Sequence, residues 1–157
     1  MRITKWGEYG IHCAVALARH AAKGKSPVRA AEIAEELSID LDYTQQILQR
    51  LRKGDVIRSV RGPQGGYQLC RDPEQITLTH VLKAAEGETF EIICVNKPLD
   101  SLQCAPNTNC FLKPVWYELR DHIEAFLSSH TIAAMAERTQ ETGFFPSPEL
   151  TMIQPRA

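Results

Sequence analysis

The sequence of 157 residues lacks several features that would assign it to other classes of protein. It has no apolar run near the roughly 18 residues of a membrane-spanning helix, so we expect no membrane partner. Its five cysteines are an odd number, which does not suit a framework of disulfides. We find no internal repeat. The first helix-like segment is interrupted by Glu8 and His12, which is untypical of a signal peptide, so we expect a cytoplasmic protein.

The composition is that of an ordinary globular protein, with 43% hydrophobic and 24% charged residues. The net charge is only −1, but basic residues are concentrated in one segment. Residues 45–71 contain six lysines and arginines against the single acidic residue Asp55. A basic block within a neutral or acidic chain is typical of a site that binds phosphates, although a solvated basic face would have the same composition.

Three helices are predicted in the first third of the chain. Residues 5–22, with Thr4 as N-cap, are apolar over most of the helix circumference, which indicates a buried central helix. Two short helices follow at about residues 29–37 and 41–53, joined by a tight turn. The last of the three buries one face and presents amides and arginines on the other. This pattern is typical of a helix-turn-helix.

A β-hairpin is predicted after the third helix. Two β-prone runs flank the sequence Gly62-Pro63-Gln64-Gly65-Gly66, and a hairpin that directly follows a helix-turn-helix is a wing. The predicted fold class is therefore mainly α, a winged helix-turn-helix with a two-stranded β wing and a long dimerisation helix. The predicted domain organisation is a DNA-binding domain at 1–86, a cysteine-bearing loop at 87–113, the dimerisation and C-terminal helices at 114–140 and a mobile tail at 141–157.

These elements predict that the chain binds double-stranded DNA and is not an enzyme. Glutamine and arginine can form bidentate hydrogen bonds with base edges in the major groove, and the other basic residues suit phosphates or the minor groove. A winged helix without a DNA-binding role is the alternative, but the basic block argues against it. The candidate DNA-binding residues are Tyr43, Gln45, Gln46, Gln49, Arg50, Lys53, Arg58, Arg61, Gly62, Gln64 and Gly65.

A helix that begins at Pro114 is predicted to form a dimer interface. Its apolar residues Trp116, Leu119, Ile123 and Phe126 follow spacings of three and four, which suits a partner helix. The same residues could instead pack on their own domain. We favour a homodimer, whose two recognition helices would read an imperfect palindrome in DNA.

Cysteines fall into two groups. Cys13 and Cys70 have apolar neighbours and are expected to be buried thiols, whereas Cys94, Cys104 and Cys110 lie in the irregular segment. Their C-x9-C-x5-C spacing matches neither structural zinc sites nor the common ferredoxins. Three loop cysteines could be redox-active thiols, or could bind a metal with a fourth ligand from elsewhere. Glu8 and His12, one helical turn apart, are candidates for that ligand, although each residue also has an ordinary structural explanation.

Several motifs resemble those of the Rrf-type winged-helix transcription regulators, the family of IscR- and NsrR-like iron–sulfur regulators. They are the opening Met-Arg-Ile-Thr-Lys, the run Leu51-Arg52-Lys53, the wing sequence from Val60 to Tyr67 and the three-cysteine loop. The resemblance extends from residue 1 to about residue 140. It implies a homodimeric repressor that binds an iron–sulfur cluster through Cys94, Cys104 and Cys110.

The resemblance also bears on the remaining cluster ligands. One branch of the family has a histidine three residues after the last cysteine, where this chain has Lys113. Other branches take a carboxylate from the first helix of the partner subunit, and one uses a glutamate and a histidine one turn apart with two cysteines. The pair Glu8 and His12 resembles that last branch, which favours [2Fe–2S] over [4Fe–4S].

The sequence therefore predicts a transcriptional regulator whose DNA affinity responds to an iron–sulfur cluster that senses redox state, nitric oxide or iron–sulfur status. One alternative is a regulator of the same fold that has no cluster and uses thiol oxidation as its switch. The other is a cluster-carrying protein of electron transfer or cluster assembly. Such a carrier would have no need of the basic block.

Overall fold

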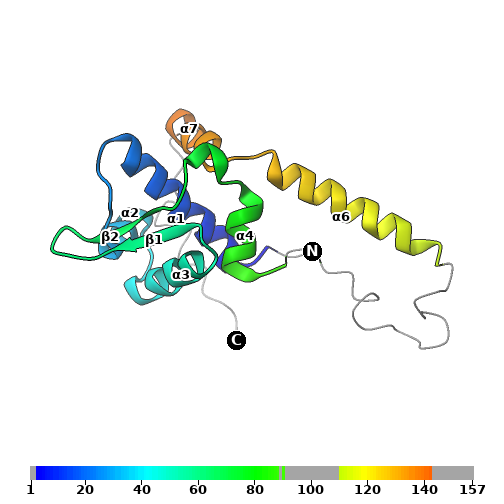
Figure 1. The fold of residues 1–157 in the computed structure, drawn as a ribbon, viewed down its shortest axis with the longest axis horizontal. Coiled ribbons are helices and arrows are strands. Elements are labelled where there is room, and N and C mark those ends of the chain that lie inside the picture. The colour runs from blue at the N-terminus through cyan, green and yellow to red at the C-terminus, as the bar shows by residue number, and fades with distance from the viewer. Residues whose placement is uncertain (1–2, 89, 91–109, 143–157) are drawn as a thin grey trace.

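The structure of the protein is a computed structural model that describes residues 3–88, 90 and 110–142 (Figure 1). Helices dominate, and the strands form one antiparallel pair. In chain order the elements are α1 (Lys5–Ala22), α2 (Ala30–Leu37), α3 (Leu41–Lys53), β1 (Ile57–Val60), β2 (Gly66–Leu69), the 3-10 helix η1 (Pro73–Gln75), α4 (Leu78–Glu86), α6 (Leu112–Ser128) and α7 (Ile132–Thr142). The predicted fold class, mainly α with a two-stranded wing, is confirmed.

Helix α1 is the central helix, as its apolar circumference predicts. The Thr4 side chain caps it by accepting a hydrogen bond from the backbone N–H of Trp6, at 3.2 Å. Every residue from Cys13 to Ala18 is buried, and α2, α3, α4 and α7 all pack against this helix. Cys13 is fully buried, as expected. Cys70 is only half-buried, because it lies just beyond the end of β2 at the edge of the hairpin.

Helices α2 and α3 form the predicted helix-turn-helix. Ser38 ends α2 in the left-handed conformation, with φ of 53°, and α3 begins three residues later at Leu41, after its N-cap Asp40. The bounds of α3 are those predicted. Helix α2 begins at Ala30 rather than Arg29, because Arg29 has extended backbone angles and serves as the N-cap.

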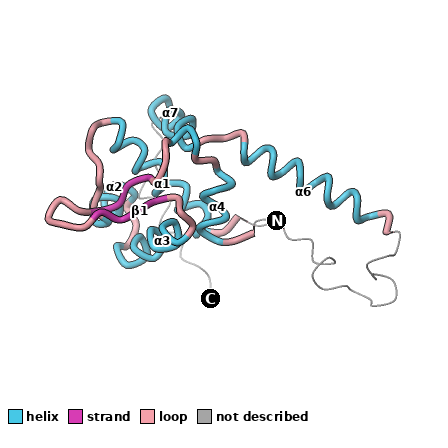
Figure 2. The backbone as a smooth tube through the Cα atoms, viewed as in Figure 1, coloured by secondary structure: helices cyan, strands magenta, loops and turns pink. Residues whose placement is uncertain are grey.

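Helix α6 leaves the winged-helix domain and extends away from it (Figure 2). It begins at Leu112, two residues before the predicted start at Pro114. A proline within the first turn removes no intrahelical hydrogen bond, because the N–H groups of that turn have no partner within the helix. The chain then returns to the domain, where Ile132 at the start of α7 is fully buried.

The return of the chain to the domain is held by backbone hydrogen bonds. Leu78 N–H donates to the His130 carbonyl at 2.9 Å, and Ile132 N–H donates to the Ile76 carbonyl at 2.7 Å. These bonds fasten α7 beside the start of α4. The predicted mobile tail lies mostly outside the described residues, as do Cys94 and Cys104. Within the described part of the chain, no helix has the length and apolar character needed to span a membrane.

Candidate nucleic-acid interface and candidate metal ligands

The rotation of α3 about its own axis is fixed by its N-terminus and its buried face. The Asp40 carboxylate accepts a hydrogen bond from Tyr43 N–H at 3.0 Å, and the buried Thr44 hydroxyl donates to the Asp40 carbonyl at 2.8 Å. Ile47, Leu48 and Leu51 are completely buried, as predicted. Because three apolar side chains and one satisfied hydroxyl face the core, the polar side chains of α3 must face outward.

The outward face of α3 borders an open hollow between this helix and the wing. The predicted DNA-binding residues Gln45, Gln46 and Gln49 line it, and Lys53 is exposed nearby on the same helix. Three further residues line the hollow and were missed by the sequence analysis: Asp42, Arg52 and Tyr67. Arg52, like Lys53, is a basic residue in the last turn of the predicted helix, so the sequence could have placed it among the DNA-binding residues. The position of Tyr67 depends on how the hairpin packs, which the sequence pattern does not give.

The wing is the predicted β-hairpin, with β1 and β2 paired antiparallel. Arg58 lies opposite Gln68, and its guanidinium donates to the Gln68 amide oxygen at 2.6 and 2.8 Å with the amide turned to face it. Arg61 and Gln64 are exposed in the turn. Gly62 adopts a φ of +117°, which a residue with a side chain would rarely adopt, and its carbonyl accepts a hydrogen bond from Gly65 N–H at 2.9 Å. The exposed basic side chains are thus carried on a tight, defined turn.

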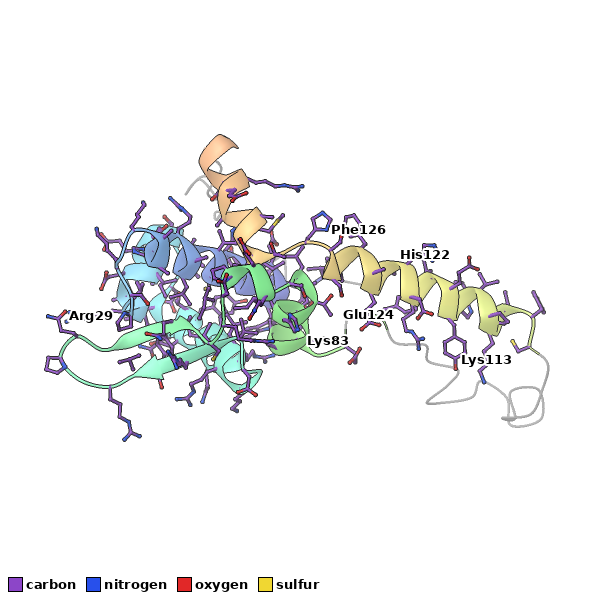
Figure 3. All side chains as sticks on the ribbon, turned by 45° about the horizontal axis from the view of Figure 1, so that its top comes forward. Arg29, Lys83, Lys113, His122, Glu124 and Phe126 are labelled. Carbon is purple, nitrogen blue, oxygen red and sulfur yellow. The ribbon has the colours of Figure 1, made fainter. Side chains whose placement is uncertain are left out.

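The wing is held against the domain by a short extended segment that the sequence analysis did not predict. Val28 forms a bridge with Tyr67, with N–H to carbonyl distances of 2.9 and 2.7 Å. A Cβ atom on Gly66 would lie 2.3 Å from the Val28 carbonyl oxygen, so this approach requires glycine. The Arg29 guanidinium donates to the Pro63 carbonyl at 2.8 Å and so reaches the tip of the wing (Figure 3).

Two of the predicted DNA-binding residues lie at the side of α3 that meets α1. The Tyr43 ring packs on Trp6, with ring centroids 4.7 Å apart, and meets Tyr9 edge-on at 5.8 Å. Burial in this cluster is the main cause that raises the pKa of Tyr43. The Arg50 guanidinium lies over the Trp6 ring at 4.1 Å and donates to the Ala85 carbonyl at 2.9 Å. Both side chains therefore contact their own domain.

The candidate metal ligands on α1 lie close to each other. Glu8 is exposed in the first turn of the helix, and His12 is half-buried one turn later. Burial lowers the pKa of His12, while the carboxylate of Glu8 acts in the opposite direction. A carboxylate oxygen and a largely neutral imidazole are suitable donors for iron.

Cys110 is half-buried just before α6, at the end of that helix far from α1 in the same chain (Figure 1). Among the described residues, no three potential metal ligands from histidine, cysteine, aspartate and glutamate lie together. Cys94 and Cys104 lie outside those residues. The structure therefore brings Glu8 and His12 together but does not bring Cys110 to them within one chain.

The predicted dimer face of α6 is largely uncovered. Trp116, Leu119 and Phe126 are 39%, 42% and 62% exposed, Ile123 is half-buried, and Val115 extends the same face. Lys113 and Glu124 lie on the opposite side of the helix from Phe126 and His122 (Figure 3). Glu124 meets Lys83 of α4 in an ion pair of 2.7 Å. Ile123 and the buried Leu127 line a hollow with Lys83, so these two apolar residues face their own domain, whereas Trp116, Leu119 and Phe126 remain exposed.

Comparisons with known proteins agree with this architecture. Residues 3–138 match the Rrf2 family, described as an iron-dependent transcriptional regulator. The IscR regulator of Sodalis glossinidius is 35% identical over 89% of this chain and 81% of its own length. A putative regulator of the helix-turn-helix type from Haemophilus influenzae is 35% identical over 88% of each chain.

Solved structures of similar proteins include two regulators with different names. The structure of T. potens IscR covers 96% of this chain and 96% of its own, with 28% identity and a TM-score of 0.67. CymR of B. subtilis, described as the global cysteine regulator, covers 88% of this chain and 98% of its own, with 25% identity and a TM-score of 0.69. These relatives are transcriptional regulators rather than enzymes. The chain belongs to the Rrf2 family of winged-helix transcriptional regulators.

Proposed function

We propose that this regulator binds an imperfect palindrome in double-stranded DNA as a homodimer, and that its affinity for DNA responds to an iron–sulfur cluster. The observation that carries the DNA-binding part is the outward face of α3, where Gln45, Gln46, Gln49 and Arg52 line an open hollow beside the wing. Glutamine amides suit adenine edges and arginine suits guanine edges, so this face can read bases in a major groove. Arg61 and Gln64 in the wing turn are exposed beyond it and suit the backbone or minor groove.

The DNA-binding proposal is tested with one residue from each part of the surface. Gln46→Ala removes an amide from α3 and should relax the preference at one base pair, at a cost of ~1–3 kcal/mol for the preferred base. Arg61→Ala removes a wing cation and should weaken binding to all sequences and reduce the salt dependence by about one counterion. Binding that is independent of salt and shows no preference for a palindrome would refute the proposal.

The uncovered apolar face of α6 supports the homodimer. A face that runs from Val115 to Phe126 and points away from its own domain has the chemistry of a partner interface. In a two-fold dimer this face would pack on its own copy. Two copies of α3 would then meet major grooves about one turn, ~34 Å, or a multiple apart.

The donors on α1 and before α6 support the cluster. Glu8 and His12 from one subunit, with Cys94 and Cys110 from the other, would supply the carboxylate, imidazole and thiolate ligands of a [2Fe–2S] cluster. The distance of Cys110 from α1 within one chain favours this arrangement across the dimer. A bound cluster would supply a redox-active group at the dimer interface that can also react with nitric oxide. A [4Fe–4S] cluster would instead use Cys104, with Glu8 as its fourth ligand.

Variants of the ligands separate the two cluster types. Cys104→Ala should leave the iron content and visible spectrum of a [2Fe–2S] protein unchanged but remove a [4Fe–4S] cluster. His12→Ala should have the reverse effect. Anaerobic purification, iron and sulfide analysis and the absorption spectrum are the measurements. If neither Cys94→Ala nor Cys110→Ala changes the iron content, the protein does not use the proposed cluster.

A second candidate is a regulator of the same fold whose cysteines act as a thiol redox switch without a cluster. The observation that favours it is the similarity to CymR of Staphylococcus aureus, solved in an oxidised form, with 30% identity and a TM-score of 0.62 over 87% of this chain. In that case oxidation of the iron-free protein would change its DNA affinity, and Cys110→Ser would abolish the change. The third interpretation, a cluster-carrying protein, finds no support among the relatives named above, which are described as regulators.

A further inference from the structure

Arg50 differs from the other polar residues of α3 in what its side chain contacts. The sequence places it on the outward face with the glutamines, but its guanidinium lies over the Trp6 ring at 4.1 Å. The same guanidinium donates a hydrogen bond to the Ala85 carbonyl in the last turn of α4, at 2.9 Å. Residues that line the hollow beside the wing do not include Arg50.

The contacts of Arg50 are those for which arginine is chemically suited. A planar guanidinium can stack on an indole face while its edge donates to a carbonyl, which a lysine ammonium cannot reproduce. The last carbonyls of a helix have no partner within the helix and carry the negative end of its dipole, so a cation is favourable at Ala85. Tyr43 covers another part of the same ring at 4.7 Å, which holds Trp6 in place.

Arg50 and the Glu86 carboxylate connect three helices, α1, α3 and α4. Glu86, the residue after Ala85, accepts a hydrogen bond from Thr4 N–H at 3.0 Å and a second, short one from the Thr4 hydroxyl. Thr4 is the N-cap of α1, and Trp6 lies in its first turn. The start of α1 is thus tied to the end of α4, and Arg50 ties both to α3. The guanidinium therefore joins α3 to both helix ends, beside the Tyr43 ring that packs on the same indole.

We propose that Arg50 is a positioning residue, which sets the orientation of α3 against the α1–α4 corner instead of contacting DNA. The inference rests on the proposed DNA-binding function and deepens it. The corner is also close in the chain to the residues that the cluster would use. Glu8 lies in the first turn of α1, and the chain leaves α4 at Glu86 toward the cysteine-bearing segment. A change in the α1–α4 corner would therefore alter the contacts of Arg50 and, with them, the orientation of the recognition helix.

The test compares the full-length wild type with Arg50→Met, Arg50→Lys and the matched control Arg52→Met, using a palindromic duplex and a series of salt concentrations. Arg50→Met should weaken binding about tenfold, equivalent to about 1.4 kcal/mol, with an unchanged slope of affinity against salt. Arg50→Lys, which keeps the charge, should fail to restore affinity. Arg52→Met, which removes a cation from the hollow, should reduce the salt slope by about one.

A double-mutant cycle with Trp6→Leu tests the contact itself. If Arg50 acts through Trp6, the effects of Arg50→Met and Trp6→Leu on DNA affinity should not add. Thermal unfolding shows that each variant is folded at the assay temperature, and a residue that served stability alone would leave the affinity of the folded protein unchanged. If Arg50→Met does not fold, the DNA affinity of Arg50→Lys tests the inference in its place.

Four results would overturn the inference. A salt slope reduced by about one in Arg50→Met, or full rescue by Arg50→Lys, would make Arg50 an ordinary phosphate contact. Additive effects with Trp6→Leu would show that Arg50 does not act through Trp6. Wild-type affinity in Arg50→Met would show that Arg50 has no role in DNA binding. If the wild type itself shows no salt-dependent binding to DNA, the proposed function has failed, which is a distinguishable outcome.

Discussion

Phe126 should contribute strongly to the free energy of dimerisation. It is 62% exposed at the end of α6, on the apolar face that runs back to Val115. Burying a whole phenylalanine side chain stabilises by ~1.5–3 kcal/mol, so the exposed part is worth about 1–2 kcal/mol in each subunit. A two-fold interface contains the residue twice, so Phe126→Ala should cost about 2–4 kcal/mol, which weakens the dimer roughly 30- to 700-fold.

Sedimentation equilibrium over a range of concentrations measures this change directly. Asp121→Ala is the matched control, because Asp121 is exposed on the same helix and lies five residues before Phe126, about 140° away around the helix axis. It should leave the dimer dissociation constant unchanged. DNA affinity should fall in Phe126→Ala at concentrations where the variant is monomeric. A monomeric wild type at micromolar concentration, or an unchanged dissociation constant in Phe126→Ala, would refute the reasoning.

Three further changes have outcomes that follow from the contacts. Gly66→Ala places a Cβ 2.3 Å from the Val28 carbonyl oxygen and should cost ~1–3 kcal/mol through the lost bridge, measured as a lower Tm and weaker DNA binding. His80 Nδ1 accepts a hydrogen bond from Thr77 N–H at the start of α4, and burial, followed by nearby cations, lowers the pKa of His80 below 6.5. Because the unfolded chain then binds the proton more readily than the folded one, the stability should fall as the pH decreases below about 6.5. His80→Gln should remove that part of the pH dependence in denaturant titrations. Burial raises the pKa of Cys13 to about 12, so iodoacetamide at pH 8 should leave this thiol unmodified in the folded protein, as peptide mass spectrometry would show.

The helix-turn-helix and the wing could be predicted because their signals are local. Thr44, Ile47, Leu48 and Leu51 repeat at helical spacing, which fixes the buried face of α3. The turn from Gly62 to Gly66 carries the glycines that its backbone requires. Nearby residues in the sequence determine these elements, so the predicted bounds of α3 match those observed.

The anchoring of the wing and of α7 could not be predicted in the same way. The bridge between Val28 and Tyr67 joins residues on either side of the helix-turn-helix, and the hydrogen bond from Ile132 to Ile76 spans the whole of α4 and α6. No local pattern marks such pairs. Val28 is one apolar residue in a Pro-Val-Arg sequence, too short a run to predict a strand.

The candidate site shows the same division between local and long-range information. Helical periodicity assigns every outward side chain of α3 to one polar face, and for Gln45, Gln46 and Gln49 the structure places those side chains beside an open hollow. The outward face of a helix in a domain is open only where no other helix meets it. Arg50 is exposed, but its guanidinium contacts Trp6 and the end of α4, so its polar group is used within the chain. The recognition helix therefore has two polar sides with different tasks, one open to DNA and one bound to the α1–α4 corner, and only the packing of α1 and α4 distinguishes them.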